Sequence, residues 1–80
     1  MKVSIKFYSG FEKYLKNRSN QDMSLDVQPG EDIKLIIHRF LPEDIVGFVG
    51  VVLVNKKITN LDYKVKDGDM IEVFPVVGGG

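Results

Sequence analysis

The chain ends in a segment whose residue types could do chemistry, Phe74-Pro75-Val76-Val77-Gly78-Gly79-Gly80. Glycine has no Cβ, so a run of glycines can pass through a channel too narrow for side chains. Such a tail can present its terminal carboxylate to the reactive groups of a partner. The segment therefore predicts that the chemistry lies at the C-terminus, with Gly80 as the reactive residue and Gly79 in the narrowest part of the channel.

The alternative is that the three glycines are a frayed end or a remnant of expression, since termini are commonly disordered. The residues that precede them favour the functional interpretation. Lys66-Asp67-Gly68-Asp69 is typical of a turn, and Met70-Ile71-Glu72-Val73-Phe74 is typical of a strand that leads directly into the glycines. We expect a folded domain over residues 1–75 and a flexible tail over residues 76–80.

Composition limits the classes of protein to which the chain can belong. Its 80 residues, 44% hydrophobic and 28% charged, predict one small soluble domain with a limited core. Lysine plus arginine equals aspartate plus glutamate at 11 each, so the net charge is zero and there is no basic footprint. Neither a nucleic acid nor a membrane is the expected partner.

The absence of cysteine excludes a disulfide framework, a thiolate nucleophile and a cysteine metal site in this chain. The first residues alternate in polarity as in a strand, and they lack the apolar core of a signal peptide. No apolar stretch approaches the length of a membrane span. We therefore expect a cytoplasmic protein.

Alternating and continuous apolar runs predict four strands. The first two contain Val3, Ile5 and Phe7, then Met23, Leu25 and Val27, and are expected to form a hairpin. The run 49–54 is apolar on both faces and β-branched, which is typical of a central strand or of one with a face for docking. Residues 55–57 turn this strand back, residues 58–65 cross over, and residues 70–74 form the last strand.

A single amphipathic helix is predicted over residues 32–41. Its apolar stripe has helical spacing, Glu31 and Asp32 suit its positive N-terminal end, and Pro42 disfavours helical geometry at Leu41. The stripe consists of Ile33, Ile36, Ile37, Phe40 and Leu41. Residues 42–47 are predicted to be a loop.

This order of elements predicts an α+β fold, a ubiquitin-like β-grasp in which a small mixed sheet packs on one main helix. Alternation directs Ile71 and Val73 toward the helix and leaves Phe74 on the opposite face. Val51 and Leu53 are expected on that same outer face. We therefore predict a partner-binding face made of Val51, Leu53 and Phe74, continued by Pro75, Val76, Val77 and Gly78.

Three stretches resemble those of a known family, the small β-grasp sulfur carriers of the molybdopterin-synthase small-subunit and thiamine sulfur-carrier type, which are relatives of ubiquitin. The stretches are Val54-Asn55-Lys56-Lys57, Val65-Lys66-Asp67-Gly68-Asp69 and Ile71 to Gly80. They are similar to the family's V-N-G, L-x-D-G-D and hydrophobic-F-P-P-V-x-G-G elements. Val65 replaces the usual leucine, Val76 replaces the second proline of the molybdopterin branch, and Gly78 is an extra glycine.

The resemblance implies that an E1-like enzyme adenylates the carboxylate of Gly80 with ATP and magnesium, and that a sulfur donor converts it into a thiocarboxylate. It also implies that the chain binds no cofactor and has no catalytic site of its own, although it could be the small subunit of molybdopterin synthase beside a large subunit. The expected pathway is molybdenum cofactor biosynthesis.

Other functions remain open at this point. A thiamine-type sulfur carrier, a protein modifier joined through Gly80 to lysines of a target, and a non-covalent interaction module would all have this sequence pattern. Asp67 and Asp69 could be an acid–base pair or a metal site, but the glycine between them makes a turn the better interpretation.

Overall fold

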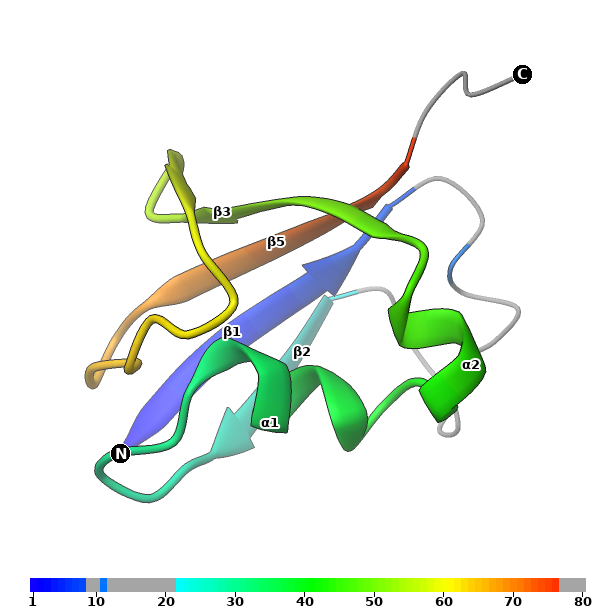
Figure 1. Ribbon diagram of the computed structural model, residues 1–80. Coiled ribbons are helices and arrows are strands. Elements are labelled where there is room, and N and C mark those ends of the chain that lie inside the picture. Colours follow the sequence, from blue (N-terminus) through cyan, green and yellow to red (C-terminus); the bar gives the residue numbers. More distant parts are fainter. Residues whose placement is uncertain (9–10, 12–21, 77–80) are drawn as a thin grey trace.

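The computed structural model of the protein describes residues 1–8, 11 and 22–76. A five-stranded mixed sheet carries two short helices on one of its faces (Figure 1). In chain order the elements are β1 (Lys2–Phe7), β2 (Asp22–Asp26), α1 (Ile33–His38), α2 (Glu43–Val46), β3 (Val49–Val54), β4 (Lys57–Thr59) and β5 (Met70–Pro75).

The last strand lies in the middle of the sheet. The strand order is β2-β1-β5-β3-β4. β5 runs parallel to β1 and antiparallel to β3, whereas the β1–β2 and β3–β4 pairs are antiparallel. β5 is paired with β1 as far as Val73 and with β3 as far as Pro75, so the sheet holds the strand up to the point where the tail begins.

The core lies between the sheet and α1, as the alternation predicts. Ile71 and Val73 of β5 are fully buried on the side of the helix, and so is Phe7 of β1. Phe7 contacts Phe11 edge-on at a centroid distance of 6.1 Å. The other core residues are Val3, Ile5, Val27, Ile33, Ile36, Ile37, Leu41, Val52, Val54 and Val65, with Phe40 partly buried against them.

The helical segment differs from the prediction over residues 32–41. Asp32 is the N-cap and its side chain accepts a hydrogen bond from the backbone N–H of Leu35, but α1 ends at His38. The chain then tightens, because the N–H of Phe40 donates to the carbonyl of Ile37, three residues back. The stripe residues Phe40 and Leu41 still contact the core from this turn, since a tighter turn keeps them on the same face.

Two short elements occupy segments that were predicted to be irregular. α2 forms within the predicted loop, where Glu43 and Asp44 lie in the first turn of a helix that follows Pro42. An acidic first turn after proline favours helix initiation. β4 includes Lys57, which was assigned to the turn, because the two residues before it, Asn55 and Lys56, have positive φ and make the hairpin by themselves.

A network of hydrogen bonds fixes the start of β5. Asp69 is 6% exposed, and its carboxylate accepts hydrogen bonds from Asn55 Nδ2 at 2.9 Å, the Tyr63 hydroxyl at 2.9 Å and the backbone N–H of Lys66 at 2.8 Å. The neighbouring Asp67 accepts a hydrogen bond from the backbone N–H of Lys2. Both aspartates therefore serve the turn, in agreement with the interpretation of the Asp-Gly-Asp sequence.

Candidate functional site

The candidate site begins where β5 leaves the sheet. Pro75 is the last residue of the strand, and the N–H of Val76 donates a 2.7 Å hydrogen bond to the carbonyl of Phe48. The other predicted tail residues, Val77, Gly78, Gly79 and Gly80, lie outside the described residues.

The predicted docking residues share the outer face of the sheet, which is the face opposite α1. Val51 pairs with Phe74 across β3 and β5, and paired residues project on the same side of a sheet. Val51 is 41% exposed, whereas Leu53 and Phe74 are half-buried. Ile58 pairs with Leu53 and extends this face to β4, with 81% of its surface exposed. A role of these residues in docking stays a prediction.

Tyr8 is part of this face and was not singled out from the sequence. Its ring stacks on Phe74 with a centroid distance of 4.4 Å and an interplanar angle of 5°. Its hydroxyl donates a 2.6 Å hydrogen bond to Glu72 Oε2. Tyr8 therefore holds Phe74 flat against the sheet, two residues before the tail begins at Val76. The alternation of β1 places Tyr8 on the same face as Lys6, which the sequence alone could indicate. Only the parallel pairing of β1 with β5 shows that Tyr8 contacts Phe74.

Glu72 is a carboxylate that is 5% exposed on the outer face. Lys56 Nζ lies 3.3 Å from each carboxylate oxygen, although only Oε2 has hydrogen-bond geometry with it, which leaves Oε1 with an ion pair alone. The hydrogen bond from Tyr8 lowers the pKa of Glu72 below its ordinary value of 4.5, and Lys56 and Lys6 add to this effect against the opposing effect of burial. The outer face thus contains a neutralised ion pair rather than a free negative charge.

The lowered pKa values of Glu72 and Asp69 predict that the folded protein loses stability in acid. Hydrogen bonds also lower the pKa of Asp69 below 3.8, despite the opposing burial of that group. Since both carboxylates have lower pKa values in the folded state, their stabilisation is complete above the unfolded pKa values and is lost as the pH falls through the folded ones. Urea unfolding of the unmodified protein should therefore show stability falling below about pH 4.5.

The variant Glu72→Gln isolates one part of this effect. It should lose less stability than the unmodified protein over the same acidic range, because its amide cannot be protonated there. Asp69 still titrates in this variant, so the pH dependence becomes shallower without disappearing. Superimposable pH profiles of the two proteins would contradict the account of Glu72.

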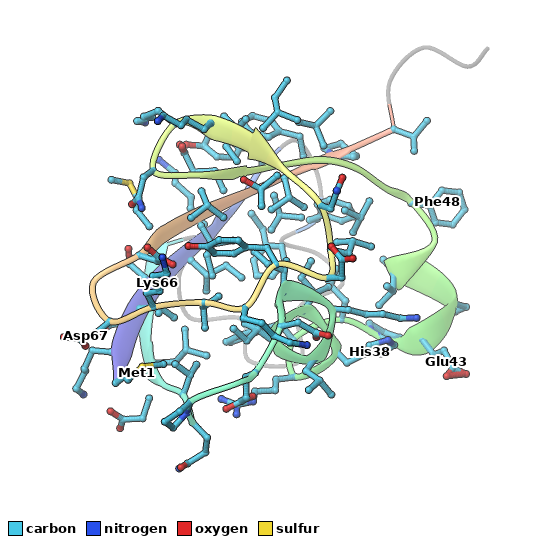
Figure 2. The ribbon with its side chains drawn as sticks, turned by 60° about the vertical axis from the view of Figure 1, so that its left-hand side comes forward. Met1, His38, Glu43, Phe48, Lys66 and Asp67 are labelled. Atoms are coloured by element: carbon cyan, nitrogen blue, oxygen red, sulfur yellow. The ribbon has the colours of Figure 1, made fainter. Side chains whose placement is uncertain are left out.

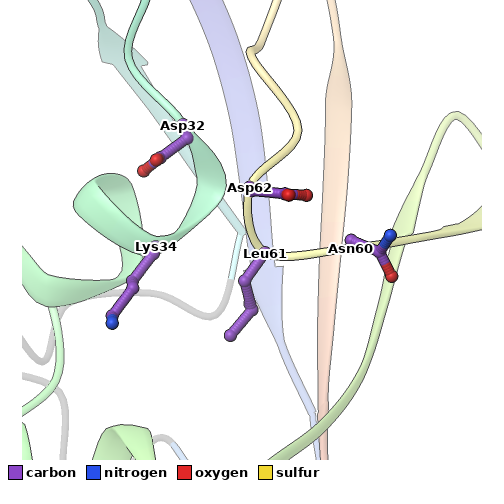
Figure 3. A pocket seen from close by; sticks show the side chains of 5 residues that line it. All are labelled: Asp32, Lys34, Asn60, Leu61 and Asp62. Atoms are coloured by element: carbon purple, nitrogen blue, oxygen red, sulfur yellow. The ribbon is translucent and has the colours of Figure 1, made fainter.

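A hollow of about 400 Å³ lies elsewhere, beside the start of α1. Figure 3 shows Asp32 and Lys34 on the helical side and Asn60, Leu61 and Asp62 on the other. Asp32 already caps α1 and pairs with Lys64 at 3.6 Å. The residues that line this hollow carry charges of both signs and form no catalytic combination of side chains. The tail therefore remains the candidate site.

Residues 1–8, 11 and 22–76 contain no group of three or more histidine, aspartate or glutamate side chains placed to hold a metal ion. Within the same part of the chain, no helix has the length and apolar character that crossing a membrane requires.

Solved structures with the same fold cover nearly the whole chain. The putative molybdopterin converting factor subunit 1 of Pyrococcus furiosus has a TM-score of 0.71 and 22% identity, over 95% of this chain and 98% of that one. Subunit 1 in a complex with subunit 2 of the molybdopterin-converting factor of Helicobacter pylori has a TM-score of 0.64 and 21% identity, with both chains fully covered. Small archaeal modifier protein 1 of Haloferax volcanii has a TM-score of 0.69 and 14% identity, over 95% and 98%. The β-grasp fold is thereby confirmed.

The sequence comparisons give one family. No curated protein matches the chain at a significant level. A model of the ThiS family matches residues 24–80, which include α1, the outer-face strands and the glycine tail. The match covers well over half of the 80 residues, and it agrees with the fold and with the sequence stretches quoted above. The protein therefore belongs to the ThiS family of ubiquitin-like β-grasp sulfur carriers.

Proposed function

We propose that the protein carries sulfur on its C-terminal glycine. A carboxylate oxygen of Gly80 attacks the α-phosphorus of ATP on an E1-like enzyme that holds magnesium, and pyrophosphate leaves. A donor of sulfide-level sulfur then attacks the acyl carbon and AMP leaves, which gives the thiocarboxylate without any net oxidation or reduction. The adenylate matters because a free carboxylate is a poor electrophile. The cofactors belong to the partner, and this chain contributes the activated terminus.

The observation that carries the proposal is the position of β5. A strand bonded on both sides leads directly into the tail, next to an outer face that has exposed apolar side chains. The family match extends through the same tail. A rigid strand that ends in bare backbone is what a carrier needs in order to place a small reactive group in the active site of another protein.

Energetics explain why a docking face is needed. Residues 76–80, if extended, reach roughly 16 Å from the sheet. Ordering five backbone residues costs on the order of 5 to 10 kcal/mol. Burial of a large apolar side chain contributes roughly 1.5 to 3 kcal/mol, so the face of Val51, Leu53 and Phe74 can offset much of this cost.

The acceptor that we propose is the precursor of molybdopterin, with a synthase large subunit as partner. Two of the similar structures are molybdopterin converting factor subunits, and one of them is bound to subunit 2. A second candidate function is protein modification through Gly80, which is favoured by the similarity to small archaeal modifier protein 1. A thiamine-type role would use the same activated terminus.

The intact mass of the chain isolated from its native host tests the proposal. Replacement of one terminal oxygen by sulfur should appear as the mass difference between the two elements, and it should disappear when the host's adenylating enzyme is deleted. A chain found only as the carboxylate or as a conjugate on lysines of other proteins, under conditions in which the sulfur product is made, would contradict sulfur transfer.

Phe74→Asp tests the docking face. Loss of its burial should weaken binding to the activating enzyme by roughly tenfold to a hundredfold. Loss of the Tyr8 stack should cost about 0.5 to 1.5 kcal/mol of stability in addition to the lost partial burial of the ring, but the fold should persist because Phe74 lies outside the core between the sheet and α1. Calorimetric titration would measure the binding. Leu35→Asp is the control, because Leu35 is 55% exposed on α1, away from the outer face. A stability collapse in Phe74→Asp, or equal effects of the two changes, would show that the face is assigned wrongly.

A further inference from the structure

Gly50 lies where β3 meets the last residues of β5. The pairing of the two strands shifts between Val49 and Val51, so Gly50 is the extra residue of a β-bulge. A Cβ at this position would lie 2.9 Å from each of three backbone atoms, the carbonyl oxygen of Pro75 and the N and Cα atoms of Val76. Backbone atoms cannot rotate away as a flexible side chain can, so this close approach requires glycine.

Phe48 provides the second contact with the same segment. Its carbonyl accepts the 2.7 Å hydrogen bond from Val76, while its side chain is 59% exposed and projects away from the domain (Figure 2). The two contacts meet at Val76, the first residue after β5. The close approach of Gly50 brings the two backbones near enough for this bond to form.

We infer that Gly50 and the Phe48 carbonyl form a clamp on Val76, the first residue of the C-terminal tail. Gly50 is then a positioning residue for adenylation of the terminal carboxylate. The role in adenylation rests on the proposed function. Because the clamp holds Val76 in place, fewer tail residues must be ordered when a partner binds.

Loss of the clamp has a measurable consequence. One more backbone residue would then have to be ordered on binding, and this corresponds to roughly a tenfold loss in kcat/KM for adenylation. The folded core should not change, because Gly50 contacts the end of β5 and not its buried centre.

Gly50→Ala tests the clamp, and Gly47→Ala is its matched control. Gly47 lies three residues before Gly50, in the connection between α2 and β3, and nothing comes within 4 Å of a Cβ added there. Gly50→Ala should lower kcat/KM for adenylation roughly tenfold, while Gly47→Ala should match the unmodified protein. Amide hydrogen exchange adds a readout that general destabilisation would not reproduce. Exchange at Val76 should accelerate in Gly50→Ala, while the amides of Ile71 and Val73 stay protected.

The outcomes separate the clamp from the proposed function. If the unmodified chain is not adenylated, the proposed function fails and the exchange data alone decide on the clamp. If Gly50→Ala is adenylated as fast as the control, or if Val76 exchanges in the unmodified protein as fast as in an unstructured peptide, the inference is overturned. Should Gly50→Ala fail to fold, protection of Val76 in the unmodified protein supports the clamp, and its absence refutes it.

Discussion

Deletion of Gly79 and Gly80 should abolish ATP-dependent adenylation of the protein. The deletion moves the terminal carboxylate back along the chain by two residues, or roughly 7 Å. A displacement of even about 1 Å from the reactive geometry can cost a factor of roughly 100 in rate, so we expect activity to fall below detection. Pyrophosphate exchange with the host's activating enzyme measures this step directly.

An added residue should have the same effect as a deletion. Appending one alanine after Gly80 moves the carboxylate forward and places a Cβ in a channel that we expect to fit bare backbone. Removal of Gly80 alone is less informative, because Gly78 and Gly79 would then present a new glycine pair. Both informative changes lie beyond β5, so unfolding curves should match those of the unmodified protein. Adenylation of either variant at the unmodified rate would disprove the carrier function.

Asp69→Ala should be strongly destabilising. The substitution leaves three donors without their acceptor, the Asn55 amide, the Tyr63 hydroxyl and the Lys66 N–H. Hydrogen bonds to charged groups contribute about 1.5 to 3 kcal/mol each, but they are not additive, so we expect a loss of roughly 3 kcal/mol. For a domain of this size this corresponds to a fall in Tm of about 12 to 24 °C.

Asp67→Ala is the matched control for Asp69→Ala. Asp67 lies in the same turn, but its single bond to the Lys2 N–H is exposed, so its loss should cost less than about 1 kcal/mol. Calorimetry of the two variants would measure the difference. Equal falls in Tm would show that the network around Asp69 does not anchor β5 as described.

The regular parts of the fold could be predicted from the sequence because they follow from local periodicity. Alternation identified β1, β2 and β5, and it identified the buried sides of β1 and β5. The helical spacing of Ile33, Ile36 and Ile37 identified α1. The end of the helix could not be placed, since the chain tightens at Phe40 while it keeps the same residues in the core. α2 and β4 are too short to produce a clear period.

Part of the candidate site could also be predicted from the sequence. The sequence by itself indicated the glycine tail, the outer-face positions of Val51, Leu53 and Phe74, and the family to which the chain belongs. These features follow from the local sequence, because a tail is one continuous stretch and the residues on one face of a strand alternate along the chain.

Only the tertiary structure decided which partners these residues have. It placed Tyr8 on Phe74, buried Glu72 beside Lys56, and brought Gly50 against the backbone of Val76. Each of these contacts joins segments that are distant in the sequence, and each depends on the order and register of the strands. Periodicity determines which face a residue occupies, whereas strand register determines its neighbour on that face.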